Sequence, residues 1–158
     1  MKNIFLILCS LLLLVSCKSD DESVADNTGN GNNKMKYNGN EVPLKGVEFY
    51  NVPDEGVILY IFENDTYYDG AMVNFRDVYF DDLDGYYTFH IIDPNFDPNS
   101  NFWSGSITNH NVEALGKPLT GGEIALKVSG NSITVDFELQ TAEGTATGHY
   151  EGPYQERD

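Results

Sequence analysis

The chain has 158 residues, 25 of them acidic and 9 basic, and its formal net charge is −16 at pH 7. Because it carries this acidic excess and no basic patch, phosphate backbones would be repelled, which argues against nucleic acid as a partner. The length fits one modest domain together with a tether.

The first residues have the pattern of a secretory signal. Lys2 supplies a positive charge, and a mostly apolar run follows from Ile4 to Val15. That run is shorter than the roughly 20 residues that span a bilayer, so it predicts an export signal and not a transmembrane helix.

The apolar run ends in Leu14-Val15-Ser16-Cys17, which resembles the lipobox of bacterial lipoproteins. The resemblance implies a signal peptide at residues 1–16, cleavage before Cys17, and acylation of the Cys17 thiol and of the new amino group. Several acyl chains hold a protein on a membrane where a single chain does not. The alternative is an ordinary signal peptide that contains a cysteine by chance.

An acidic segment, Lys18-Ser19-Asp20-Asp21-Glu22, follows the cysteine directly. It resembles the signal that sends Bacteroidota lipoproteins to the outer face of the outer membrane, and therefore implies a lipid-anchored protein that faces the cell exterior. The alternative is a solvated acidic linker in a periplasmic protein. Residues 17–35 are predicted to be the lipidated cysteine and a flexible linker, since this stretch has too few apolar residues to form a core.

Residues 36–158 are predicted to be one all-β domain. The expected strands are Leu44–Tyr50, Val57–Phe62, Ala71–Phe80, Tyr86–Ile92, Asn101–Thr108, Glu123–Val128, Ile133–Gln140 and Thr145–Gly152, and Asn111–Leu115 is expected to form at most a helical turn. Asp84-Gly85 suits a hairpin turn between the third and fourth of these strands. About eight sequential strands without crossover helices favour an antiparallel β-sandwich or a closed β-barrel, and the pattern does not separate the two.

The clearest structural signal is a hairpin around Gly130-Asn131. A two-residue loop sets a register in which Val128 faces Ile133, Ile124 faces Phe137 and Glu123 faces Glu138. This hairpin and the segment from Gly148 to Tyr154 resemble the terminal hairpins of small Bacteroidota lipoproteins. That resemblance implies fold and origin but no activity.

Three aromatic residues, Phe96, Phe102 and Trp103, lie in or beside a loop rich in Asn and Pro. Flat rings rimmed by amides and carboxylates commonly hold sugar rings, so these residues are candidate glycan contacts. Alternating aromatic residues in strands are more often part of the core.

The same loop contains a weak calcium candidate, because Asp93, Asn95, Asp97 and Asn99 place oxygen atoms at alternate positions. Pro98 stands where an EF-hand requires glycine, and two consecutive turns explain the same residues more simply. Asp77, Asp81, Asp82 and Asp84 form a second, weaker cluster. No cofactor is otherwise expected.

Enzyme motifs are missing from the sequence. The three histidines, His90, His110 and His149, have no metal-binding spacing, and Ser104 lies outside any Gly-x-Ser-x-Gly motif. The sequence therefore predicts a non-enzymatic lipoprotein that binds a glycan or an envelope partner. The alternatives are an accessory subunit that pairs through exposed strand edges and, less favoured, an exported hydrolase.

The lipid anchor is tested by Cys17→Ala. Without the thiol no lipid is attached and signal peptidase leaves the precursor uncut, so we expect loss of the acylated mature mass and of outer-membrane localisation, measured by mass spectrometry and fractionation. An unchanged mature mass together with full membrane retention would contradict the lipoprotein assignment.

Overall fold

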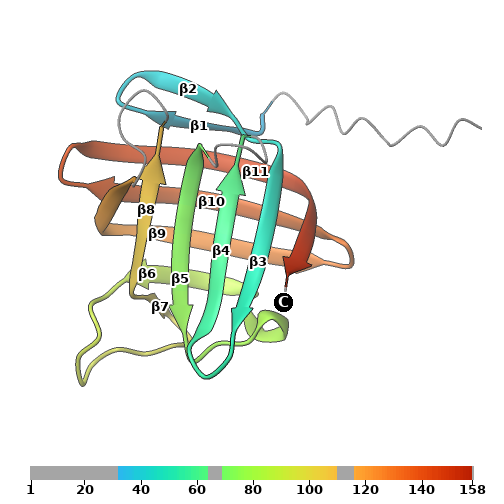
Figure 1. Ribbon diagram of the computed structural model, residues 1–158, viewed down its shortest axis with the longest axis vertical. Helices are drawn as coiled ribbons and strands as arrows, with labels where there is room; N and C mark the ends of the chain where they lie inside the picture. Colours follow the sequence, from blue (N-terminus) through green and yellow to red (C-terminus); the bar gives the residue numbers. More distant parts are fainter. Residues whose placement is uncertain (1–31, 64–68, 110–115, 158) are drawn as a thin grey trace, which may run out of the picture.

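The computed structural model describes residues 32–63, 69–109 and 116–157, which form an all-β domain (Figure 1). Its elements are β1 (Lys34–Tyr37), β2 (Asn40–Pro43), β3 (Gly46–Val52), β4 (Gly56–Phe62), β5 (Gly70–Arg76), the 3₁₀ turn η1 (Phe80–Asp82), β6 (Gly85–Phe89), β7 (Asn101–Phe102), β8 (Ser104–Thr108), β9 (Lys117–Ser129), β10 (Ser132–Thr141) and β11 (Gly144–Arg157). No helix in the described part of the chain is long and apolar enough to cross a membrane.

Seven of these strands close into a barrel, which confirms the all-β prediction and decides for the barrel. The ring runs β11-β3-β4-β5-β8-β9-β10 and back to β11. Two further pairs of strands lie outside it: β1 and β2 extend the sheet from β11, and β6 and β7 extend it from β9. In Figure 1, β3, β4, β5 and β8 run across the direction of β9, β10 and β11.

The long strands β9 and β11 each belong to both layers. The start of β9 pairs with β8 and its remainder pairs with β10 and β6. In β11, the residues up to Pro153 pair with β10, and Tyr154 to Arg157 pair with β3 in parallel. This parallel pair closes the ring and departs from the purely antiparallel expectation.

A break in the β9–β10 ladder marks where β9 turns from one layer to the other. The register shifts between Gln140 and Thr141, and Gly122 nearby has φ of 118°. A bulge bends a strand and increases its twist, and only glycine adopts such a φ without strain. The corner of β9 therefore depends on local backbone geometry.

The predicted hairpin register is confirmed. Val128 pairs with Ile133, Ile124 with Phe137, and Glu123 with Glu138, around a turn in which Gly130 has φ of 58°. The apolar members of this register lie inside the barrel, and its charged members lie outside.

Large apolar side chains fill the barrel interior. Phe75 packs edge-on against Tyr87 at 4.9 Å and against Phe102 at 6.4 Å between ring centroids, and Tyr150 is fully buried nearby in the same cluster. Burial of one such side chain stabilises the fold by roughly 1.5–3 kcal/mol. The interior is therefore the core of the domain, and ligand sites are to be sought on its outer surfaces.

The predicted hairpin at Asp84-Gly85 is wrong. β5 ends at Arg76, η1 follows, and β6 pairs with β9 instead of β5. Neither Asp84 nor Gly85 has the positive φ that a type I′ turn needs at both central residues.

The predicted domain boundary at residue 36 falls inside β1. Met35 is fully buried, and the Asn33 side chain donates to the Glu151 carbonyl at 2.9 Å, so the ordered domain begins before residue 36.

The hairpin β1–β2 turns at Asn38-Gly39, where both residues have positive φ. That pair is a strong hairpin signal which the sequence prediction overlooked.

The corner of β9 is tested by Gly122→Ala. A Cβ there would lie 2.3 Å from the Glu138 carbonyl oxygen on a backbone with positive φ, so we expect a loss of about 1–3 kcal/mol in the free energy of unfolding, measured by urea denaturation. Gly121→Ala is the matched control, because its Cβ would meet only the flexible end of Gln140. Equal effects of the two substitutions would show that the corner does not require Gly122.

Candidate functional site

The three aromatic residues predicted to bind a glycan do not form one platform. Phe102 is fully buried, with Phe89 5.6 Å away between ring centroids, whereas the next residue, Trp103, is 38% exposed. Phe96 lies in the loop before β7 and is half-buried. Neighbouring residues in an extended chain point to opposite sides, so Phe102 faces the core and only Trp103 of this pair reaches a surface.

Trp103 borders a hollow of about 310 Å³ at the turn between β3 and β4, which we name the Trp103 cleft. It is lined by Val52, Glu55, Gly56, Val57, Ile58, Asn74, Phe75, Arg76 and Trp103. The Trp103 backbone N–H donates to the Asn74 carbonyl at 3.1 Å, which ties the indole to β5. The cleft thus combines one exposed aromatic ring, that of Trp103, with the buried Phe75, aliphatic side chains and a few polar groups.

Asn74 has an unused polar atom in this cleft. Its Nδ2 donates to Ser104 Oγ at 2.6 Å, but its Oδ1 is buried and has no hydrogen-bond partner among the described residues. A buried polar atom without a partner is unfavourable, so a hydrogen-bonding ligand would be stabilised here.

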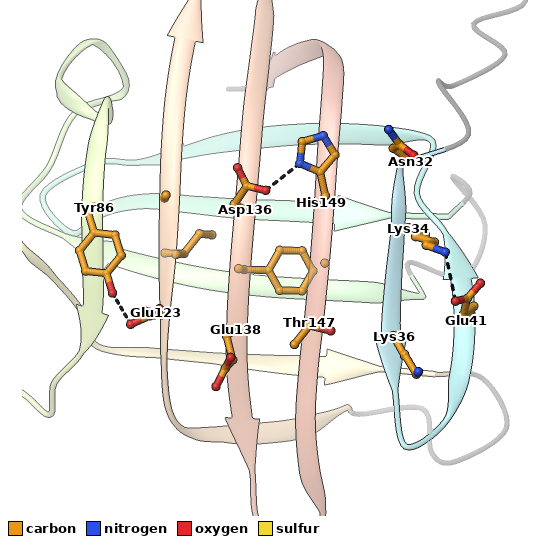
Figure 2. Close-up of a pocket in the computed structure, with 14 residues that line it drawn as sticks. Asn32, Lys34, Lys36, Glu41, Tyr86, Glu123, Asp136, Glu138, Thr147 and His149 are labelled. Carbon is orange, nitrogen blue, oxygen red and sulfur yellow. Dashed lines mark hydrogen bonds and ion pairs between the residues drawn. The ribbon is translucent and has the colours of Figure 1, made fainter.

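A second hollow, the outer groove, has a volume of about 510 Å³ and lies on the solvent face of β1, β11, β10, β9 and β6 (Figure 2). Pairing between these strands aligns its side chains in two rows. One row is Lys36, Thr147, Glu138 and Glu123, and the other is Lys34, His149, Asp136, Ala125 and Tyr86. The lysines therefore lie at one side and the carboxylates towards the other.

Several of these polar groups are already paired. His149 Nδ1 lies 2.7 Å from Asp136 Oδ1, Lys34 Nζ lies 3.1 Å from Glu41 Oε1, and the Tyr86 hydroxyl donates to Glu123 (Figure 2). That hydrogen bond to a carboxylate is the main reason that the pKa of Tyr86 is raised. The sequence prediction did not assemble this groove, because its residues come from six strands.

The loop that was a calcium candidate uses its carboxylates to cap turns. Asp93 Oδ1 accepts from the Asn95 backbone N–H at 2.7 Å, and Asp97 Oδ1 accepts from that of Asn99 at 3.0 Å. The Asn99 N–H and the Ser100 hydroxyl lower the pKa of Asp97. These bonds support the interpretation as two consecutive turns. Among the described residues, no group of three or more His, Cys, Asp or Glu side chains is placed to hold a metal ion.

Other predicted residues are dispersed or lie elsewhere. His90 Nδ1 contacts the Ile91 carbonyl oxygen at 2.7 Å, and Asp77 pairs with Arg76 at 3.4 Å. Cys17 and the segment Lys18-Ser19-Asp20-Asp21-Glu22 lie outside the described residues, as do His110 and Asn111–Leu115. Their assignments stay predictions.

The chain was compared with protein families, curated proteins and solved structures. No family model matches the chain, and neither the curated proteins nor the solved structures contain a significant match.

The capping role of Asp97 predicts a pH-dependent effect of Asp97→Ala. Folding lowers the pKa of this carboxyl below its ordinary value of 3.8, so its stabilisation is present above that value and is lost as the pH falls through the folded pKa. We expect Asp97→Ala to melt below the wild type at neutral pH, with the difference shrinking in acid. A melting temperature that millimolar calcium raises in the wild type but not in Asp97→Ala would instead indicate a metal site.

Proposed function

We propose that this protein is a lipid-anchored, non-enzymatic binding protein of a bacterial outer membrane, which faces the cell exterior and holds a glycan in the Trp103 cleft. The lipobox at Cys17 and the acidic segment after it support the location. Because the net charge is −16, the acyl chains and not the protein surface would provide membrane affinity.

The observation that carries the proposal is the pairing of an accessible indole with an unsatisfied amide. Trp103 offers a flat apolar face to a sugar ring, and rotation of the Asn74 side chain would bring its buried, unpaired Oδ1 to a sugar hydroxyl. Glu55 and Arg76 add an acceptor and donors at the rim. An apolar surface with a few placed polar groups is the usual composition of a small-ligand site.

The composition of the cleft supports binding without hydrolysis. A glycosidase commonly needs two carboxyl groups about 5–9.5 Å apart across the scissile bond. Glu55 is the one carboxylate among the residues that line the Trp103 cleft. A bound sugar would therefore meet no acid–base pair there.

Pairing through exposed strand edges, the alternative, has less support. Barrel closure removes the edges of the ring, and the sheet ends that stay open in the described part are β2 and β7. β2 has four residues and ends in Pro43, and β7 has two. Short edges with proline are how proteins prevent strand addition.

Glycan binding is tested by titrating intrinsic fluorescence, since Trp103 is the single tryptophan of the chain. We expect members of a panel of host and plant glycans to change its emission, and Trp103→Ala to weaken binding about tenfold by calorimetry, as loss of roughly 1.4 kcal/mol implies. Tyr79→Ala is the matched control, because Tyr79 is an exposed aromatic residue outside the cleft. Unaltered emission across the panel, or full affinity in Trp103→Ala, would contradict the proposal.

A further inference from the structure

The outer groove is separate from the Trp103 cleft and has a different chemistry. The strands outside the ring form its two sides: β1 and β2 bring Lys34, Lys36 and Glu41, and β6 brings Tyr86 (Figure 2). The floor between them includes small residues such as Ala125 and Gly148. The middle strands also bring Asp136, Glu138, Thr147 and His149, so polar groups line the floor as well as the sides.

Gly148 is required by packing on the inner side of the same sheet. A Cβ at this position would lie 2.2 Å from the Phe137 ring, which packs against the glycine. The core therefore requires glycine at this position, because a side chain here would point inward.

Two opposite charges in the groove form no ion pair, although Glu41 lies opposite Lys36 in the β1–β2 register. Lys34, Asp136 and Glu123 are engaged with Glu41, His149 and Tyr86 respectively. For Lys36 and Glu138, by contrast, the described part of the chain supplies neither an ion pair nor a side-chain hydrogen bond. These two residues occupy the same row, with Thr147 of β11 between them.

The spacing of this free pair sets the size of a complementary ligand. Lys36 and Glu138 are two strand intervals apart, which is roughly 9.5 Å between their backbones. An extended peptide advances about 3.3–3.6 Å per residue, so three residues span about 10 Å. The groove volume of about 510 Å³ also lies within the usual range of small-ligand sites.

We propose that the outer groove binds a short peptide of about three residues with both termini free. Its terminal ammonium lies at Glu138, beside Glu123, and its terminal carboxylate lies at Lys36. A purely cationic ligand would leave Lys36 without a partner, and a purely anionic ligand would be repelled by the carboxylates on β9 and β10. A zwitterion of this length pairs its carboxylate with Lys36 and its ammonium with Glu138.

The test uses trialanine and its N-acetylated and C-amidated forms, with binding measured by calorimetry. We expect trialanine to bind, and removal of either terminal charge to weaken binding about fivefold, the size of an exposed charge pair. In Lys36→Gln the C-amidated and free peptides should bind alike, and in Glu138→Gln the N-acetylated and free peptides should do so. Each variant thus abolishes discrimination at one terminus only.

The matched controls are Lys127→Gln and Glu151→Gln, which make the same charge changes. Both residues are exposed, on β9 and β11 respectively, and lie outside the groove lining. Both should keep wild-type discrimination, and Trp103→Ala should keep peptide binding even where glycan binding is lost. The proposal is overturned if trialanine does not bind, if the blocked peptides bind as well as the free one, or if spermidine competes with trialanine as an equal.

Discussion

Closure of the barrel depends on the two strands that belong to both layers. β9 leaves its pairing with β10 through a bulge and a glycine with positive φ, and β11 exchanges β10 for β3 after Pro153. At each of these two corners, in β9 and in β11, one strand covers two sides of the same apolar core. Without them the molecule would be two open sheets with unpaired edges, which invite association with other chains.

The same arrangement decides where ligands could bind. Because apolar side chains fill the interior, the described domain offers its outer faces, and the strands outside the ring shape one of them. β1–β2 and β6 turn the solvent side of β9–β11 into a groove with both lysines and Glu41 on one flank and the other carboxylates on β9 and β10 (Figure 2). The Trp103 cleft lies on the other layer, so the two proposed activities have separate surfaces.

Local signals predicted well what local geometry controls. The β9–β10 register followed from a two-residue turn and strict alternation, since shifting by one residue would expose every apolar side chain. The same approach failed at Asp84-Gly85, because a dipeptide with turn propensity does not show which strands it joins. For the candidate sites, Trp103 was identified by its residue type, but its neighbour Phe102 proved to be core. No local pattern indicates a groove whose residues come from six strands.

The sequence by itself determined the strand-forming segments after β2, the lack of thiols after Cys17, and the register of the hairpin at Gly130-Asn131, because each depends on neighbouring residues alone. Only the tertiary structure decided between sandwich and barrel. That choice rests on the parallel pairing of β11 with β3, which joins segments far apart in the chain. The free charges of Lys36 and Glu138 became a pair for the same reason: strand order brings them to one row, and strand order is set by how the whole core closes.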